Sequence, residues 1–205
     1  MSDVRRLGAL FFPGFELLDT FGPLEMFGNC QGAIDVVTVA GAAGPVRSAQ
    51  GPEVVAQYGL ADCPPLDLLL VPGGIGTRDA AQDDVLVDWV RTRSDAAELV
   101  MTVCTGTALP AQAGLLDGRR ATTNKAVFSW LETTWPNVRW VRAARWVEDG
   151  KFVTSSGVSA GIDMALAVIA KLLSPQLADG LALGTEYEWH RDAGWDPFAK
   201  AHGLV

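Results

Sequence analysis

Cys104 is the residue of this sequence best suited to nucleophilic chemistry. It follows the apolar, β-type run Leu99–Val103 and precedes Gly106, and the segment from Thr107 to Ala113 is typical of a short helix. A residue on such a strand-to-helix turn faces the first N–H groups and the positive dipole end of the helix. These surroundings lower the pKa of a thiol and favour the thiolate that attacks electrophiles. We therefore expect a nucleophilic Cys104, although most free cysteines are buried structural residues.

Two further groups follow predicted strands and are expected at the same edge of the sheet. Asp19 lies beyond the apolar run Leu7–Phe12, among apolar neighbours that favour burial and a raised pKa. Leu66–Val71 is a second apolar run, and it leads into Gly73 and Gly74. Glycine lets the backbone N–H groups approach an oxyanion closely. In open α/β sheets, ligands bind at the carboxyl ends of the strands. We therefore expect Asp19, Gly73 and Gly74 to form one ligand-binding site together with Cys104.

The elements that must position these residues alternate between strands and helices along the whole chain. This alternation predicts one doubly wound α/β domain over residues 1–205, with a mostly parallel sheet. No linker, repeat or low-complexity segment indicates a second domain. The predicted strands are 7–12, 34–40, 66–71, 99–103, 140–146 and 151–155, with a small antiparallel excursion at 46–56, and the predicted helices are 23–28, 83–93, 107–113, 125–133, 159–173 and 175–188.

The composition excludes several classes of function. The 205 residues are 49% hydrophobic, with a net charge of −8 and no cluster of basic residues, which argues against nucleic-acid binding. No apolar run reaches membrane-spanning length and no secretion signal is present, so we expect a cytoplasmic protein with no membrane partner. Three widely spaced cysteines and two histidines give no metal-binding pattern, and we expect neither a metal nor another cofactor.

Five motifs appear in a fixed order: Phe-Pro-x-x-x-x-Leu-Asp-x-x-Gly-Pro, Asp-x-x-x-Val-Pro-Gly-Gly, Val-Cys-Thr-Gly, Ala-Thr-Thr and Ser-Ala-Gly-Ile-Asp. Over nearly the whole chain this order resembles the DJ-1/PfpI superfamily, and within it the branch that contains isocyanide hydratase. The resemblance implies a flavodoxin-like sandwich with a nucleophile elbow, related to glutamine amidotransferases, and a homodimer. It also implies that Cys104 is the nucleophile, Asp19 the acid beside it, and Gly73, Gly74 and Thr105 the N–H donors around the site, with the Thr105 hydroxyl near Asp19 or the substrate.

The activity implied by this resemblance is a lyase reaction on a small electrophile. Cys104 would attack an isocyanide to give a thioimidate, Asp19 would deliver the proton, and water would release an N-substituted formamide. The sequence departs from the hydratases at Asn124-Lys125, where His-Trp is usual. Thr105 stands where PfpI-type proteases have histidine, which disfavours peptidase activity. Two alternatives remain: an enzyme for another small electrophile, such as a glyoxal, an aldehyde or an amide, and a cysteine-based redox or ligand sensor.

We assign structural roles to the other chemically versatile side chains. Four tryptophans are expected to pack in the core or at a dimer interface, and two cysteines lie away from the turn. Two histidines and a glutamate are expected at the surface, and one aspartate is expected to cap or pair at the start of its helix. These residues are Trp130, Trp135, Trp140, Trp146, Cys30, Cys63, His190, His202, Glu16 and Asp163.

Overall fold

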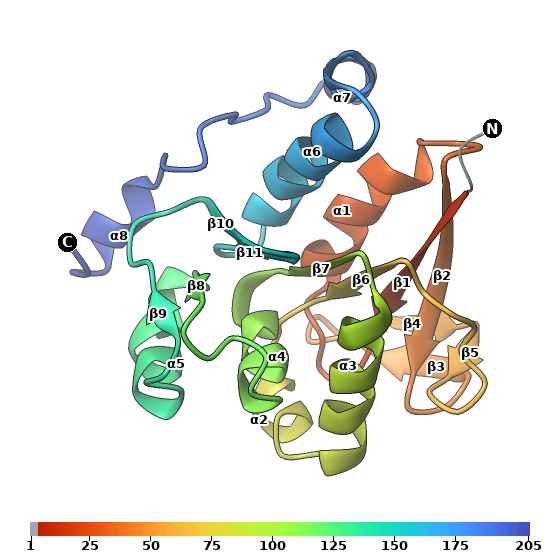
Figure 1. Cartoon of the computed structure of the whole chain (residues 1–205), viewed down its shortest axis with the longest axis horizontal. Helices are drawn as coiled ribbons and strands as arrows, with labels where there is room; N and C mark the ends of the chain where they lie inside the picture. The colour runs from red at the N-terminus through yellow and green to blue at the C-terminus, as the bar shows by residue number, and fades with distance from the viewer. Residues whose placement is uncertain (1–3) are drawn as a thin grey trace.

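A seven-stranded sheet forms the centre of the structure, a computed structural model that describes residues 4–205 (Figure 1). Its strands are β1 (Arg5–Leu10), β2 (Ile34–Ala40), β5 (Tyr58–Gly59), β6 (Leu68–Val71), β7 (Leu99–Thr102), β10 (Trp146–Asp149) and β11 (Phe152–Ser155). Their order is β10-β11-β7-β6-β1-β2-β5, and every neighbouring pair is parallel except β10 with β11. The predicted α/β class with a mostly parallel sheet is confirmed.

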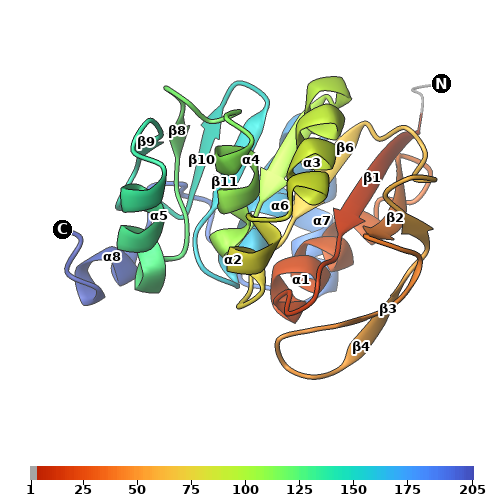
Figure 2. The same cartoon turned by 90° about the horizontal axis from the view of Figure 1, so that it is seen from below.

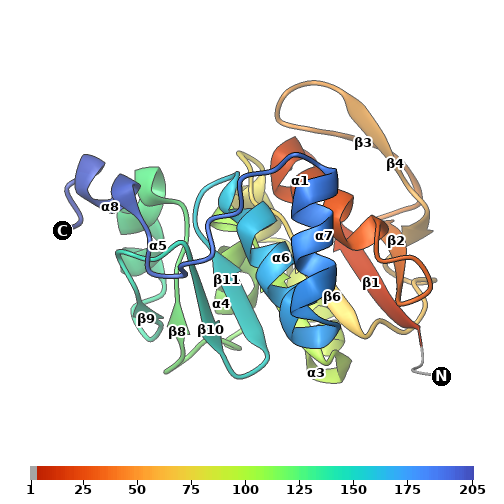
Figure 3. The same ribbon diagram turned by 90° about the horizontal axis from the view of Figure 1, so that it is seen from above.

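Helices cover both faces of this sheet (Figures 1 and 3). One face carries α1 (Leu17–Gly28), α6 (Ala160–Leu172) and α7 (Pro175–Gly184), and the other carries α2 (Thr77–Ala80), α3 (Asp84–Ala96) and α4 (Ala108–Gln112). Within the described part of the chain, no helix has the length and hydropathy needed to cross a membrane.

Smaller elements lie around the central sheet and its two helix layers. The hairpin of β3 (Gly44–Arg47) and β4 (Glu53–Ala56) extends from one side of it (Figure 2) and confirms the predicted antiparallel excursion. At the opposite end of the sheet the chain forms the 3-10 turn η2 (Lys125–Val127), α5 (Phe128–Thr134), the short pair β8 (Arg120–Ala121) and β9 (Arg139–Trp140), and α8 (Pro197–Ala201).

The apolar strands form two cores because successive side chains of a strand point to opposite faces. In β6, Leu68 and Leu70 pack in the core beneath α1 and α6, whereas Leu69 and Val71 pack in the core beneath α3 and α4. All four side chains are fully buried. A strand buried on both faces has a continuous apolar sequence, which is why these central strands were predictable.

The start of α1 differs from the prediction. We expected Pro23 in the first turn, but the helix begins at Leu17 and Pro23 lies in its interior. Proline has no N–H to donate to the carbonyl four residues earlier, which weakens an isolated helix at this point. Here close packing on α6 compensates, since a Cβ atom at Gly22 would lie 2.7 Å from Cγ1 of Ile162. Asp19 therefore belongs to the first turn of a helix and not to a loop.

The predicted strand 140–146 is also wrong over most of its length. Only the short β9 and Trp146 have strand structure, and the segment between them pairs with the C-terminal tail. The Ala144 N–H donates to Oδ2 of Asp196 at 3.1 Å, and the Arg145 N–H donates to the carbonyl of Ala193 at 2.7 Å. The tail therefore satisfies the backbone groups that a neighbouring strand would otherwise bond.

Directly after β7, the chain passes very close to the end of β6. A Cβ atom at Gly106 would lie 2.3 Å from the carbonyl oxygen of Val71 and 2.6 Å from that of Pro72. No side chain fits at this distance from backbone atoms, so the approach requires glycine. The contact holds the 3-10 turn η1 (Cys104–Thr107) against the neighbouring strand.

We predict that Gly106→Ala lowers the free energy of unfolding by about 1–3 kcal/mol, because the added methyl group displaces backbone atoms of β6. Urea unfolding of the purified variant measures this change. Gly180→Ala in α7 is the matched control, since nothing lies within 4 Å of the position of its Cβ atom. The control is expected to leave stability unchanged or to raise it by up to about 1 kcal/mol. Equal urea midpoints for Gly106→Ala and the unmodified protein would contradict the packing described above.

Candidate active site

The backbone at Cys104 makes the sharp turn that the sequence predicts. Its φ angle is 57°, in the left-handed region that residues other than glycine rarely adopt. The Cys104 N–H donates to the carbonyl of Ser156 at 3.0 Å, and the Thr123 hydroxyl donates to the Cys104 carbonyl at 2.8 Å. These bonds hold the strained residue from both sides. Cys104 therefore occupies a sharp, strained turn at the end of β7, and it is buried to 6% exposure.

Asp19 reaches the same place from the first turn of α1. Its side chain is fully buried, and Oδ2 accepts a hydrogen bond from the Gly73 N–H at 2.8 Å. Oδ1 has no hydrogen-bond partner among residues 4–205. Burial raises the pKa of Asp19 to about 7, and the charge of Glu16 adds to the rise, whereas the Gly73 hydrogen bond and the Cys104 thiol oppose it. Asp19 therefore gains and loses a proton near neutral pH.

The Cys104 sulfur is surrounded by hydrogen-bond donors but is not a resting thiolate. Nδ2 of Asn124 lies 3.2 Å from the sulfur, and the backbone N–H groups of Thr105 and Val158 also favour the charged form. Burial outweighs these donors and, together with the charge of Asp19, raises the pKa of Cys104 to about 12. The predicted lowering of this pKa is wrong, because a single turn of helix does not compensate for removing the thiolate from water.

The glycine turn after β6 supports the site differently from our expectation. The Gly73 N–H is bonded to Asp19, and the Gly74 N–H donates to Oγ1 of Thr105 at 3.0 Å. Oγ1 of Thr105 also lies 2.8 Å from Oγ1 of Thr77, so this hydroxyl is not bonded to Asp19. Neither glycine N–H is free to bind an oxyanion in this geometry. The three residues lie at the site, where they position Asp19 and the backbone beside Cys104.

A cavity of about 220 Å³ opens above Cys104. Trp130 lines it, with the Arg78 guanidinium 4.3 Å from the centre of its ring, and also packs edge-on against Trp135 with 5.6 Å between the ring centres. Glu16 also lines the cavity and accepts a hydrogen bond from Nε2 of Gln50 at 2.6 Å. In the sequence Asn124 is only a departure from a motif, and no local pattern indicates its contact with the Cys104 sulfur.

Asp163 has the structural role that was predicted. It forms a buried ion pair with Arg145 at 2.6 Å, and Oδ1 accepts hydrogen bonds from the Tyr187 hydroxyl and the His190 N–H, both at 3.0 Å. These bonds attach the start of the tail to α6.

The His190 ring stacks on Trp195, with 4.1 Å between the ring centres.

The other two cysteines are free thiols buried away from the elbow, and burial raises the pKa of Cys30 to about 11. Within residues 4–205, no group of three or more histidine, cysteine, aspartate or glutamate side chains is arranged to hold a metal ion.

The DJ-1/PfpI family model matches residues 5–171, and the chain belongs to this family. Isonitrile hydratase of Pseudomonas putida is 34% identical over 182 residues, which are 89% of this chain and 78% of that protein. The transcriptional regulator CdhR of Pseudomonas aeruginosa is 34% identical over 135 residues, or 66% of this chain and 40% of the regulator. The crystal structure of a ThiJ/PfpI family protein from Pseudomonas syringae matches with a TM-score of 0.85 and 31% identity, covering 92% of this chain and 77% of that one.

We predict that Asp19→Asn makes Cys104 easier to ionise, because the substitution removes the nearby negative charge and keeps an acceptor for the Gly73 N–H. Alkylation of Cys104 by iodoacetamide at pH 8 should become up to about tenfold faster, which corresponds to one pKa unit. Peptide mass spectrometry measures the rate, and Cys30 in the same sample is the internal control. Slower alkylation of Cys104 in the variant than in the unmodified protein would contradict this electrostatic description.

Proposed function

We propose that the protein is an isocyanide hydratase that converts an isocyanide and water into an N-substituted formamide. The observation that carries this proposal is the buried pair of Cys104 and Asp19, in which a nucleophile and a proton carrier with a pKa near 7 lie side by side. Support also comes from the 34% identity to a protein named isonitrile hydratase over most of both chains, isonitrile being another word for isocyanide.

In the first half of the proposed reaction, the Asp19 carboxylate accepts the proton of the Cys104 thiol. The sulfur then forms a bond to the terminal carbon of R–N≡C, and protonated Asp19 returns the proton to that carbon. The product is a thioimidate, R–N=CH–S, attached to Cys104. The donors around the sulfur, including the Asn124 amide, stabilise the thiolate that exists transiently before attack.

In the second half, water adds to the same carbon. Its oxygen bonds to carbon, one proton goes to nitrogen, and the resulting adduct is R–NH–CH(OH)–S. The C–S bond then breaks while Asp19 transfers the hydroxyl proton to sulfur, which releases R–NH–CHO and restores the thiol. The net reaction adds one water to the isocyanide, and it uses no cofactor.

Homodimer formation is part of this proposal, as the family resemblance implies. Three large apolar side chains that are exposed near the site support it. Leu18 and Phe21 on α1 are each 42% exposed, and Ile75, beside the mouth of the cavity, is 76% exposed.

A ligand sensor is the second candidate, because the chain also matches transcriptional regulators such as CdhR. The raised pKa of Cys104 disfavours the redox form of this alternative, since oxidation proceeds through the thiolate. A sensor of this kind would bind an isocyanide or a formamide and release it unchanged, so turnover separates the two candidates.

We predict that the purified protein forms formamide from at least one member of a panel of alkyl and aryl isocyanides, and that Cys104→Ala reduces this to the uncatalysed rate. Liquid chromatography with mass detection quantifies the formamide. Cys30→Ala is the control for loss of a buried thiol, and it should retain the activity. Full activity of Cys104→Ala would refute the covalent route, and no turnover by the unmodified protein would refute the proposed function.

We also predict that kcat/KM rises with pH through about 7 and then levels off, because the ionised form of Asp19 accepts the thiol proton. Asp19→Asn should lose this rise and retain between about one-hundredth and one ten-thousandth of the rate. A stopped-flow or discontinuous assay from pH 5.5 to 9 in buffers of constant ionic strength measures both effects. A wild-type rate that falls as pH rises through 7 would contradict the assigned role of Asp19.

A further inference from the structure

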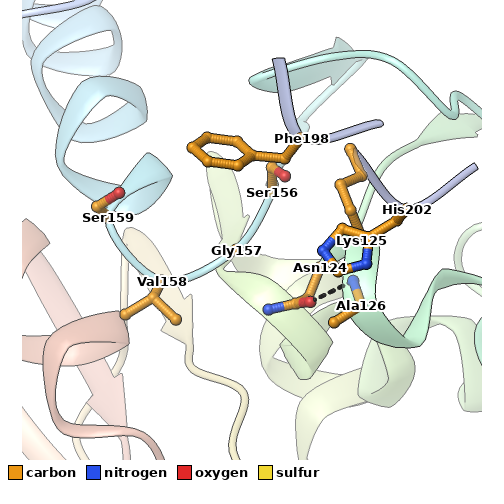
Figure 4. Close-up of a pocket in the computed structure, with 9 residues that line it drawn as sticks. All are labelled: Asn124, Lys125, Ala126, Ser156, Gly157, Val158, Ser159, Phe198 and His202. Atoms are coloured by element: carbon orange, nitrogen blue, oxygen red, sulfur yellow. Dashed lines mark hydrogen bonds between the residues drawn. The ribbon is translucent and has the colours of Figure 1, made fainter. Parts of the chain in front are cut away.

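A second cavity of about 270 Å³ lies next to the Cys104 cavity (Figure 4). The two cavities share three lining residues, Asn124, Ala126 and Val158. Each cavity alone is smaller than the 300–1,000 Å³ typical of small-molecule sites, whereas the two joined fall within that range. This relation suggests that one ligand occupies both.

The Asn124 side chain forms the partition between the cavities. Its Nδ2 donates to the Cys104 sulfur at 3.2 Å, and its Oδ1 accepts a hydrogen bond from the Ala126 N–H at 2.8 Å. A Cβ atom at Gly157 would lie 2.8 Å from this Nδ2 atom, so the loop before α6 leaves room for the amide only because residue 157 is glycine. A molecule attached to Cys104 therefore passes this amide when it extends into the second cavity.

The second cavity is lined by a serine hydroxyl and by an aromatic ring. Ser156 is 2% exposed, and within residues 4–205 its hydroxyl forms no hydrogen bond with another residue. The residue lines the cavity, so its hydroxyl can exchange hydrogen bonds with a polar group of a ligand. Figure 4 shows the Phe198 ring beside Ser156, at one end of the loop that leads to Val158, with His202 beside Asn124.

The C-terminal tail holds this wall in place through buried contacts. Asp196 forms an ion pair with Lys125 at 3.2 Å, and the two side chains are 1% and 2% exposed. The other oxygen of Asp196 accepts hydrogen bonds from the N–H groups of Phe198 and Ala199, at 2.9 and 3.1 Å, and so begins α8. Because Lys125 follows Asn124 directly, the same ion pair connects the tail to the partition between the cavities.

We propose that this second cavity binds the substituent R of the isocyanide and selects an aromatic R that carries a hydrogen-bonding group. The ring packs against Phe198 and Val158, an arrangement that aromatic side chains favour, and the polar group bonds to the Ser156 hydroxyl. The inference rests on the proposed hydratase function only in taking the isocyanide carbon as the end of the ligand that reacts with Cys104. The cavity itself, its serine hydroxyl and its position beside Cys104 do not depend on that function.

Substrate preference gives the first test. The ratio of kcat/KM for 4-hydroxyphenyl isocyanide to that for 4-methylphenyl isocyanide should exceed one and fall about three- to tenfold in Ser156→Ala, the loss expected for one hydrogen bond. Ser129→Ala, at an exposed serine of α5, is the matched control and should leave the ratio unchanged. An equal ratio in Ser156→Ala and the unmodified protein would overturn the proposed subsite.

Binding gives a second test that requires no turnover. The chain has two histidines, of which His202 lines the second cavity and His190 stacks on Trp195. Titration with N-(4-hydroxyphenyl)formamide should therefore shift the proton NMR signals of the His202 ring saturably and leave those of His190 in place. Absence of a His202 shift at high probe concentration would overturn the subsite. If the protein hydrates no isocyanide but His202 still shifts, the proposed function fails and the subsite stands.

Discussion

The burial of a carboxyl group against a thiol is the constraint on which the rest of this structure depends. Asp19 is fully buried, and its pKa is raised from 3.8 to about 7, so ionisation is unfavourable in the folded protein. Since the folded pKa exceeds the unfolded one, the protein is most stable with Asp19 protonated and loses stability as pH rises from about 4 to 7. The loss is on the order of 4 kcal/mol. Cys104 beside it resists ionisation as well. At neutral pH the thiol therefore keeps its proton, while Asp19 exchanges its own with solvent.

Three separate elements deliver the parts of this pair to one edge of the sheet. The turn after β7 places Cys104, and its tight fit depends on the absence of a side chain at Gly106. The first turn of α1 places Asp19, and packing on α6 maintains that helix around Pro23. The glycine turn after β6 fixes the carboxyl group through the Gly73 N–H. Because the strands concerned are parallel neighbours or near neighbours, their carboxyl ends bring these segments together.

The sequence predicted the features that depend on local patterns. Strands such as Leu68–Val71 are buried on both faces and therefore have continuous apolar sequences, and an apolar run before Cys104 and Gly106 indicates a sharp turn. It failed where distant segments decide the result. The pKa of Cys104 depends on burial and on a carboxyl group 85 positions away, and the hydrogen bonds of Gly73 and Gly74 depend on Asp19 and Thr105. The positions of Asn124 and Trp130 beside the Cys104 cavity likewise appear only when the chain is folded.

The most direct test of this account is the titration of the Asp19 carboxyl group itself. Carbon NMR of protein labelled at the aspartate carboxyls, assigned by comparison with Asp19→Asn, follows its ionisation between pH 3 and 9. We expect a signal that titrates near pH 7, well above the ordinary aspartate pKa of about 4, and that moves lower when Cys104→Ser replaces the thiol with a stronger hydrogen-bond donor. A signal that titrates near the ordinary aspartate pKa of about 4 would contradict the proposed proton transfer between Asp19 and Cys104.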